Sequence, residues 1–297
     1  MKREVTFNTG DKSCHLEIGY ANPHVISGGS PGRVKRMAGY LDKVDEVIES
    51  DRGLVTVNGS YKGVPITAFS TGMGSASASI TLPEVIEACD DPNMTILRIG
   101  TCGAFQNYMN IGDFVVTENV DIAEGTSAKI MGEGYKASAD IEVMGKILNA
   151  VAQYGENFQS THVGTSRVTD DIYFDGAHSK YVLTGIPQKG VPEIPAEELQ
   201  EFRAKYENIL GVSMEFSVYC ALRDKYNADF EKNIQVGNLL VVSDLVVEKE
   251  NSTGREDFET NKPLIEEAHI KVGLETLVGL YRTQNPIGKI GSEHWLG

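Results

Sequence analysis

Short apolar runs that alternate with stretches of helical periodicity constrain the fold of this chain more than any other feature of its sequence. Such alternation predicts an α/β fold with a mixed, largely parallel central sheet flanked by helices. Because no Pro/Ser-rich linker divides the 297 residues, we expect residues 1–297 to form a single domain. The expected strands cover 24–27, 54–58, 64–70, 94–99, 113–118 and 238–243, and the expected helices cover 33–48, 76–89, 140–154, 196–208, 214–226 and 262–282.

One apolar run is followed by glycines in a way that suggests an anion site. In Leu97–Ala104, Arg98 stands near the end of the run, and Gly100 and Gly103 follow it. We expect Arg98 at the carboxyl edge of the sheet, where α/β proteins build their binding sites. We expect the glycines to form a small-residue turn whose backbone N–H groups approach an anion closely. A phosphate group suits both expectations.

Two further arginines occupy settings that suit the same anion. Residues 25–32 read as an apolar strand that runs into a Gly/Pro turn, and Arg33 opens the helix expected after it. Backbone donors at a helix start, together with a guanidinium, bind phosphate well. Arg52 is expected to end a helical stretch just before the strand-like residues 54–59. The alternative interpretation is that the arginines are unrelated surface or capping residues.

With these segments in place, the chain resembles the nucleoside phosphorylase family, which contains purine nucleoside phosphorylases and uridine phosphorylases. The resemblance runs from about His15 to about Leu280. It implies a pentosyltransferase that catalyses reversible phosphorolysis of a nucleoside to free base and ribose 1-phosphate in nucleoside salvage. It also implies that phosphate is a substrate and that neither a metal nor an organic cofactor is required.

The resemblance assigns roles to residues that are spread along most of the chain. The implied phosphate ligands are Gly29, Arg33, Arg52, Arg98 and Thr101, and the implied ribose contacts are His15, Met73, Met214 and Glu215. Arg98 is also expected to act in catalysis. Two residues depart from the family pattern: Ser30 stands where many members have Asp, and Ser213 replaces the first Glu of an E-M-E motif.

Two of these residues imply an oligomer. In the family, the counterparts of His15 and Arg52 reach into the site of the neighbouring subunit. The resemblance therefore implies a homodimer with shared active sites, and it leaves open whether three dimers assemble further.

The base pocket gives conflicting signals. Asp244 follows an apolar run and a Val-Ser pair, and in purine-cleaving members such an Asp protonates N7 of the departing base. Tyr173 is expected to stack on the base. The long connection from Ile172 to Glu215 instead resembles that of uridine phosphorylases. We therefore favour a purine substrate slightly, with a uridine phosphorylase of variant uracil pocket as the alternative.

A variant uracil pocket would need new contacts to the base. The Gln and Arg with which uridine phosphorylases bind uracil fall at Ala177 and Ser179, which cannot make those hydrogen bonds. Lys180 and Tyr181 are the candidates to replace them.

Several other interpretations stay open. Glu215 at a helix start suits a purely electrostatic role toward the helix dipole, and Asp244 suits a cap or turn. At the level of function, the alternatives are a hydrolytic nucleosidase and a non-catalytic nucleoside-binding protein on the same scaffold. The Gly-x-Gly at Gly72–Gly74 is weak support for a dinucleotide site, because no acidic ribose ligand follows at the expected distance.

Composition narrows the partners and the location. A net charge of −15 disfavours a nucleic-acid surface, which needs clustered Lys and Arg. The 4 cysteines lack C-x-x-C spacing, so neither a zinc site nor a disulfide framework is expected. The first residues lack the apolar core of a signal peptide, and no 18-residue apolar run occurs. We expect a cytoplasmic protein without membrane contact.

Overall fold

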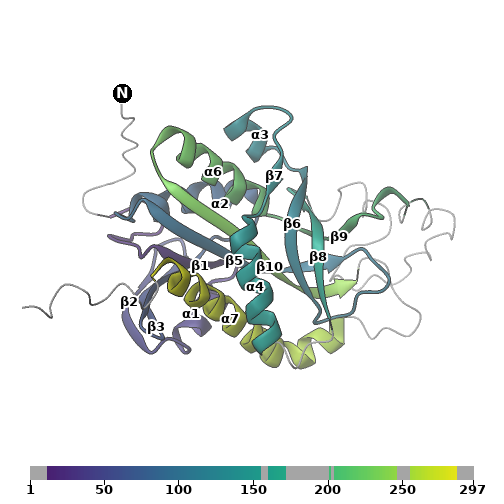
Figure 1. Cartoon of the computed structure of the whole chain (residues 1–297), viewed down its shortest axis with the longest axis horizontal. Helices are drawn as coiled ribbons and strands as arrows, with labels where there is room; N and C mark the ends of the chain where they lie inside the picture. The colour runs from purple at the N-terminus through teal and green to yellow at the C-terminus, as the bar shows by residue number, and fades with distance from the viewer. Residues whose placement is uncertain (1–11, 155–159, 172–200, 202–203, 246–254, 286–297) are drawn as a thin grey trace, which may run out of the picture.

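A mixed sheet runs through the part of the chain that the computed structural model describes, which is residues 12–154, 160–171, 201, 204–245 and 255–285 (Figure 1). The sheet has 10 strands, and helices cover both of its faces. The strands are β1 (His24–Gly28), β2 (Lys43–Glu49), β3 (Val55–Tyr61), β4 (Val64–Ser70), β5 (Asn93–Ala104), β6 (Phe114–Ala123), β7 (Ala137–Ser138), β8 (Thr161–Thr169), β9 (Ile209–Ser213) and β10 (Asn233–Leu245). The helices are α1 (Pro31–Ala38), α2 (Ser75–Glu87), α3 (Thr126–Met131), α4 (Ile141–Tyr154), α6 (Phe216–Asp229) and α7 (Arg255–Gln284).

The strand pairings close part of the sheet into a ring. The order is β10-β6-β8-β9-β5-β1-β4-β3-β2, and β10 pairs in addition with β5. Parallel ladders join β4 to β1, β1 to β5, β5 to β10, β6 to β8 and β8 to β9, whereas the other pairings are antiparallel. The expected mixed α/β architecture is confirmed. In the ring β5-β10-β6-β8-β9, every strand has a neighbour on both sides.

Alternation along the strands divides the core between the two faces. In β5, Leu97 and Ile99 pack in the core cluster that contains residues of α1, α4 and α7. Ile96 packs in the opposite cluster, with residues of α2 and α6. Because successive strand residues point to opposite faces, Arg98 shares the face of Ile96, on the side of α2 and α6.

Most of the expected elements are confirmed at shifted boundaries, but one expected helix is wrong. The predicted helix 33–48 is divided: α1 ends at Ala38, and residues 43–49 form β2, which pairs antiparallel with β3. The β-branched Val44, Val47 and Ile48 favour this strand. Strands β7, β8 and β9 were not expected, and most of the predicted helix 196–208 lies outside the described residues.

Two expected local structures are also wrong. Residues 100–104 are not a turn, because β5 continues through Ala104 and pairs with β10 and β9. Arg52 does not end a helix but lies in the turn between β2 and β3, where Gly53 has φ 73°.

Within the described ranges, no helix is both long enough and apolar enough to span a bilayer.

Candidate active site

Arg98 is a buried cation inside β5, and the residue two places along makes room for it. Its side chain is 4% exposed. A Cβ on Gly100 would lie 2.3 Å from a terminal nitrogen (Nη1) of Arg98, so the guanidinium lies directly over the glycine. Gly100 therefore provides space for a neighbouring side chain, which differs from the anion-binding turn expected for it.

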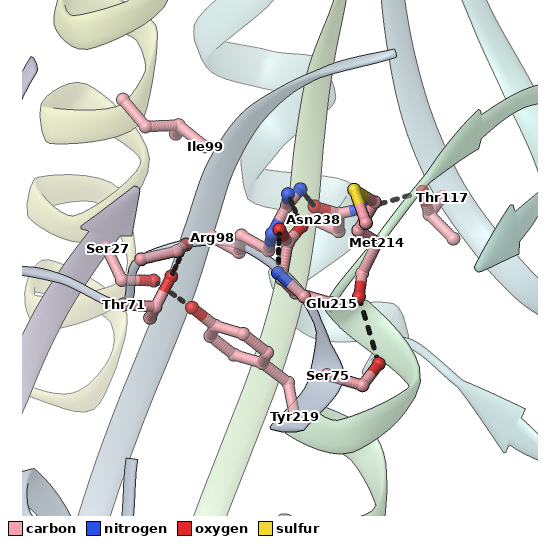
Figure 2. A network of polar contacts seen from close by, with 12 residues as sticks. Ser27, Thr71, Ser75, Arg98, Ile99, Thr117, Met214, Glu215, Tyr219 and Asn238 are labelled. Atoms are coloured by element: carbon pink, nitrogen blue, oxygen red, sulfur yellow. Dashed lines mark hydrogen bonds and ion pairs between the residues drawn. The ribbon is translucent and has the colours of Figure 1, made fainter. Parts of the chain in front are cut away.

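The Arg98 guanidinium is held between two strands and a helix start (Figure 2). One terminal nitrogen donates to Oδ1 of Asn238 on β10 at 3.1 Å, and the other forms an ion pair with Oε2 of Glu215. Glu215 precedes α6 and is 5% exposed. Its second carboxylate oxygen accepts the backbone N–H of Gly74 at 3.0 Å. The structure thus brings together an expected phosphate ligand and an expected ribose ligand.

The turn between β4 and α2 forms the next wall of the site. The Ser75 hydroxyl donates to the carbonyl of Met214 at 2.9 Å, which fixes the start of α2 beside the start of α6. Gly72 and Gly74 have φ of 72° and 86°, a region that other residues rarely adopt. Met73 between them is 82% exposed, and Met214 is partly buried. The two methionines expected at the sugar therefore flank the Gly74 and Glu215 contact in sequence.

Arg33 lies on α1 and is anchored from two directions. Its Nη1 donates to the carbonyl of Ile99 at 3.3 Å, and its Nε lies 3.9 Å from Glu266 of α7. Glu266 also pairs with Arg36 at 2.6 Å. Burial lowers the pKa of Arg33, the Glu266 carboxylate raises it, and the positive charge of Arg98 lowers it further. The two arginines are thus close enough to repel each other, and an anion between them would relieve that repulsion.

The ends of β5 and β10 place Thr101 and Asp244 along the same ladder. The register shifts between Val242 and Asp244, and Asp244 then pairs with Gly103. The Ser243 hydroxyl donates to Oδ1 of Asp244 at 2.7 Å. Thr101 and Asp244 are both partly exposed, so each remains accessible to a ligand at this edge. Burial, together with the Asp244 carboxylate, raises the pKa of the neighbouring Cys102 thiol.

In the described part of the chain, His15 and Arg52 form no hydrogen bond or ion pair with the residues of this cluster. Nδ1 of His15 is 2.6 Å from Oε1 of Glu84 on α2, and Glu84 also accepts the backbone N–H of Leu16 at 2.8 Å. Arg52 is exposed in the turn between β2 and β3. The expected base contacts Tyr173, Lys180 and Tyr181 lie outside the described residues. Gly29 packs close to the neighbouring turn, since a Cβ on it would lie 3.0 Å from the Gly72 carbonyl.

Several residues at the site were not expected from the sequence. Asn238 is fully buried in an apolar strand, and a buried amide that must find partners is the signal that could have revealed it. Ser27 and Tyr219 share a 2.8 Å hydrogen bond beneath the site, where burial raises the pKa of Tyr219 to about 12. Glu266 occurs in an ordinary helical pattern, and nothing in the sequence pairs it with Arg33.

The described residues contain little that would hold a metal. No group of three or more His, Cys, Asp or Glu side chains in these ranges is arranged to bind an ion. Among the described residues, Cys14, Cys89, Cys102 and Cys220 are not joined in disulfide bonds.

Comparisons with known proteins place these features in context. A family model described as the phosphorylase superfamily matches residues 23–278. Guanosine phosphorylase of Halorubrum lacusprofundi is 35% identical over 166 residues, which cover 55% of this chain and 66% of that protein. Uridine phosphorylase of Thermococcus kodakarensis is 34% identical over 150 residues, covering 50% of this chain and 52% of that protein. Purine nucleoside phosphorylase of the DeoD type from Oceanobacillus iheyensis is 26% identical over 255 residues, covering 86% and 93%.

Proposed function

Because this chain belongs to the phosphorylase superfamily, we propose that it catalyses the reversible phosphorolysis of a ribonucleoside by inorganic phosphate. The products are the free base and ribose 1-phosphate. Relatives named as guanosine, uridine and purine nucleoside phosphorylases support this reaction class.

The contact between Arg98 and Glu215 carries the proposal. Phosphorolysis needs an anion-binding cation and a sugar-binding carboxylate side by side, because phosphate attacks the sugar at C1′. Arg98 and Glu215 form a buried ion pair. Arg33 lies close enough for the positive charge of Arg98 to lower the pKa of Arg33. A hydrolytic nucleosidase, which activates water, has no use for two such arginines.

The proposed chemistry divides the work among these groups. Cleavage of the glycosidic bond leaves an oxocarbenium-like sugar, so the phosphate dianion must lie beneath C1′ as the base departs. Arg33 and Arg98, with the Thr101 hydroxyl and the backbone at Gly29, hold the phosphate. Glu215 accepts hydrogen bonds from the ribose hydroxyls, beside Met214 and Met73. Asp244 at the sheet edge protonates, or hydrogen-bonds, the departing base.

Two ligands of the proposed site come from a second subunit. In one chain, His15 is bound to Glu84, and Arg52 is exposed on the turn between β2 and β3. We propose that both complete the site of a neighbouring copy in a cytoplasmic homodimer, which leaves open a further assembly of three dimers. No organic or metal cofactor takes part in the proposed reaction.

Phosphate dependence of base release tests the reaction. We expect the purified chain to release free base from a nucleoside only when phosphate is present, with ribose 1-phosphate formed in equal amount. Release of base without phosphate would identify a nucleosidase, and binding without release would identify a nucleoside-binding protein. Arg98→Ala should cost at least about 2 kcal/mol of transition-state stabilisation, because a charge-assisted contact to phosphate is lost.

A substrate panel tests the choice of base. We favour purines because Asp244 provides the carboxyl group that N7 protonation needs. Inosine, guanosine or adenosine should be cleaved faster than uridine or thymidine, and Asp244→Asn should depress purine turnover strongly, since an amide cannot deliver the proton. Uridine as the best substrate would instead support the variant uracil pocket, and substitution of Lys180 or Tyr181 would then identify its base contacts.

A further inference from the structure

We propose that Asn238, Thr117 and Ser166 form a positioning network that holds the Arg98 guanidinium available to phosphate. The inference rests on the proposed function and adds residues that do not touch either substrate. The network begins at Arg98 and crosses the ring of strands from β5 through β10 and β6 to β8 (Figure 2 shows its first links).

The network starts with an amide in the middle of an apolar strand. Asn238 lies in Val236–Val242 of β10, where the parallel register places it directly beside Arg98. Its side chain is fully buried, and burial of an amide without partners costs several kcal/mol. Its Oδ1 accepts from Arg98 at 3.1 Å. The position therefore tolerates a polar side chain because the arginine satisfies it.

The far end of the amide contacts a chain of two buried hydroxyl groups. Nδ2 of Asn238 donates to Oγ1 of Thr117 at 2.8 Å, and Thr117 shares a 2.8 Å hydrogen bond with Ser166. Thr117 and Ser166 are both fully buried. If the amide were reversed, its NH₂ group would face the guanidinium, which has only donors to offer. The Arg98 contact therefore selects the orientation of the amide, and the Thr117 hydroxyl accepts the N–H that this orientation presents.

The two partners of Arg98 differ in charge, and the neutral partner, Asn238, leaves the positive charge of Arg98 available to phosphate. Glu215 carries a negative charge and draws the guanidinium toward the proposed ribose subsite. Asn238 holds the other terminal nitrogen without neutralising the cation. Loss of the amide would leave Glu215 as the stronger remaining anchor, and phosphate would then compete with a carboxylate for a displaced guanidinium. The network therefore acts on phosphate affinity more than on nucleoside affinity.

The experiment compares Asn238→Ala, Thr117→Val and Thr117→Ser in the full chain. Binding of inorganic phosphate is measured by calorimetry, and KM is measured separately for phosphate and for nucleoside. We expect Asn238→Ala to weaken phosphate binding about tenfold or more, since a hydrogen bond to a charged group is lost. We expect a loss of about threefold for Thr117→Val and of less than about twofold for Thr117→Ser, which keeps the hydroxyl. The nucleoside KM should change less than about twofold in all three.

Other results separate the network from the proposed function. If phosphate binding is unchanged in Asn238→Ala and Thr117→Val, or if phosphate and nucleoside KM rise equally, the network is merely structural and the inference is wrong. If Asn238→Ala fails to fold, the difference between Thr117→Val and Thr117→Ser decides alone. If the unmodified chain itself binds no phosphate, the proposed function fails, and the inference fails with it.

Discussion

At the scale of single residues, the site depends on the period of two along β5. Arg98 and Gly100 lie on the same face of the strand, and the absence of a side chain on Gly100 leaves the space that the guanidinium occupies. The sequence predicts a turn at this glycine, whereas the structure shows a strand in which the glycine leaves room for Arg98. A short glycine-rich segment looks the same in a turn and in a strand, and only the ladders to β10 and β9 distinguish them.

Gly100→Ala tests this geometry. The new methyl group would lie 2.3 Å from a terminal nitrogen of Arg98, so the guanidinium must move away from Asn238 and Glu215. We expect the phosphate KM to rise at least about tenfold, as when a charged hydrogen bond is lost. Steady-state kinetics with varied phosphate provide the measurement.

Gly145→Ala is the matched control for this substitution. Gly145 lies in α4, and a Cβ there meets nothing within 4 Å. The control should keep normal kinetics and gain up to about 1 kcal/mol of stability from helix propensity. A normal phosphate KM in Gly100→Ala would contradict the role assigned to the glycine.

At the scale of elements, local sequence patterns predict the buried segments well, but they predict the ends of these segments less well. The apolar runs of β1, β5 and β10 were recognisable because both faces of each strand are covered. The largely exposed β2 has a sequence that predicts a helix, since Lys43, Asp45 and Glu46 dilute its alternation and its partner β3 comes later in the chain. The contact between Arg98 and Asn238 joins residues 140 positions apart, which no local pattern can predict.

Helix α7 brings a fully buried histidine against the sheet. Nε2 of His269 donates to the carbonyl of Leu239 at 2.9 Å, and its ring packs against Phe114. Burial, together with the positive charges of Arg33 and Arg98, lowers the pKa of His269 to about 3, although the hydrogen bond to the Leu239 carbonyl acts in the opposite direction. The imidazole is therefore neutral in the folded protein throughout the usual pH range.

This histidine should make the protein less stable in acid. The unfolded chain takes up a proton on His269 below about pH 6.5, whereas the folded chain does so only near pH 3, so stability falls as pH falls between these values. The loss should reach up to about 1.4 kcal/mol per pH unit from this group.

His269→Gln retains an N–H donor for the Leu239 carbonyl but does not titrate. Urea unfolding at several pH values should give a smaller loss of stability between pH 6 and pH 4 for the variant, by up to about 1.4 kcal/mol per pH unit. All other titrating groups are common to both proteins, so the difference isolates His269. Parallel curves for the two proteins would show that His269 does not contribute.

At the scale of the whole molecule, the cluster in one chain contains Arg33, Arg98 and Glu215 but not Arg52 or His15. If the proposed dimer shares its sites, a chain that lacks Arg52 and a chain that lacks Glu215 should restore each other. An equimolar mixture of inactive Arg52→Ala and Glu215→Gln proteins forms mixed dimers as half of the total, each with one intact site. Activity should therefore return to about a quarter of the unmodified level.

The complementation experiment needs proof that subunits exchange. Differently tagged chains should be recovered together, and a mixture of Arg98→Ala with Glu215→Gln should stay inactive, because those residues contact each other within one chain. Verified mixed dimers without activity would show that each site is built from a single chain.

Outside the closed ring, β2 is an edge strand of the sheet, and a long edge strand can promote self-association. In the described part of the chain, β2 pairs only with β3, and its Val44 and Val47 are exposed. An exposed, apolar edge strand can pair with the extended backbone of another chain and so start aggregation. Four charged residues of β2 lie near these valines, namely Lys43, Asp45, Glu46 and Glu49. A second chain that paired with β2 would have to bring its backbone against their charges. The charged residues that interrupt the strand pattern of β2 in the sequence thus also oppose aggregation of the folded protein through this edge.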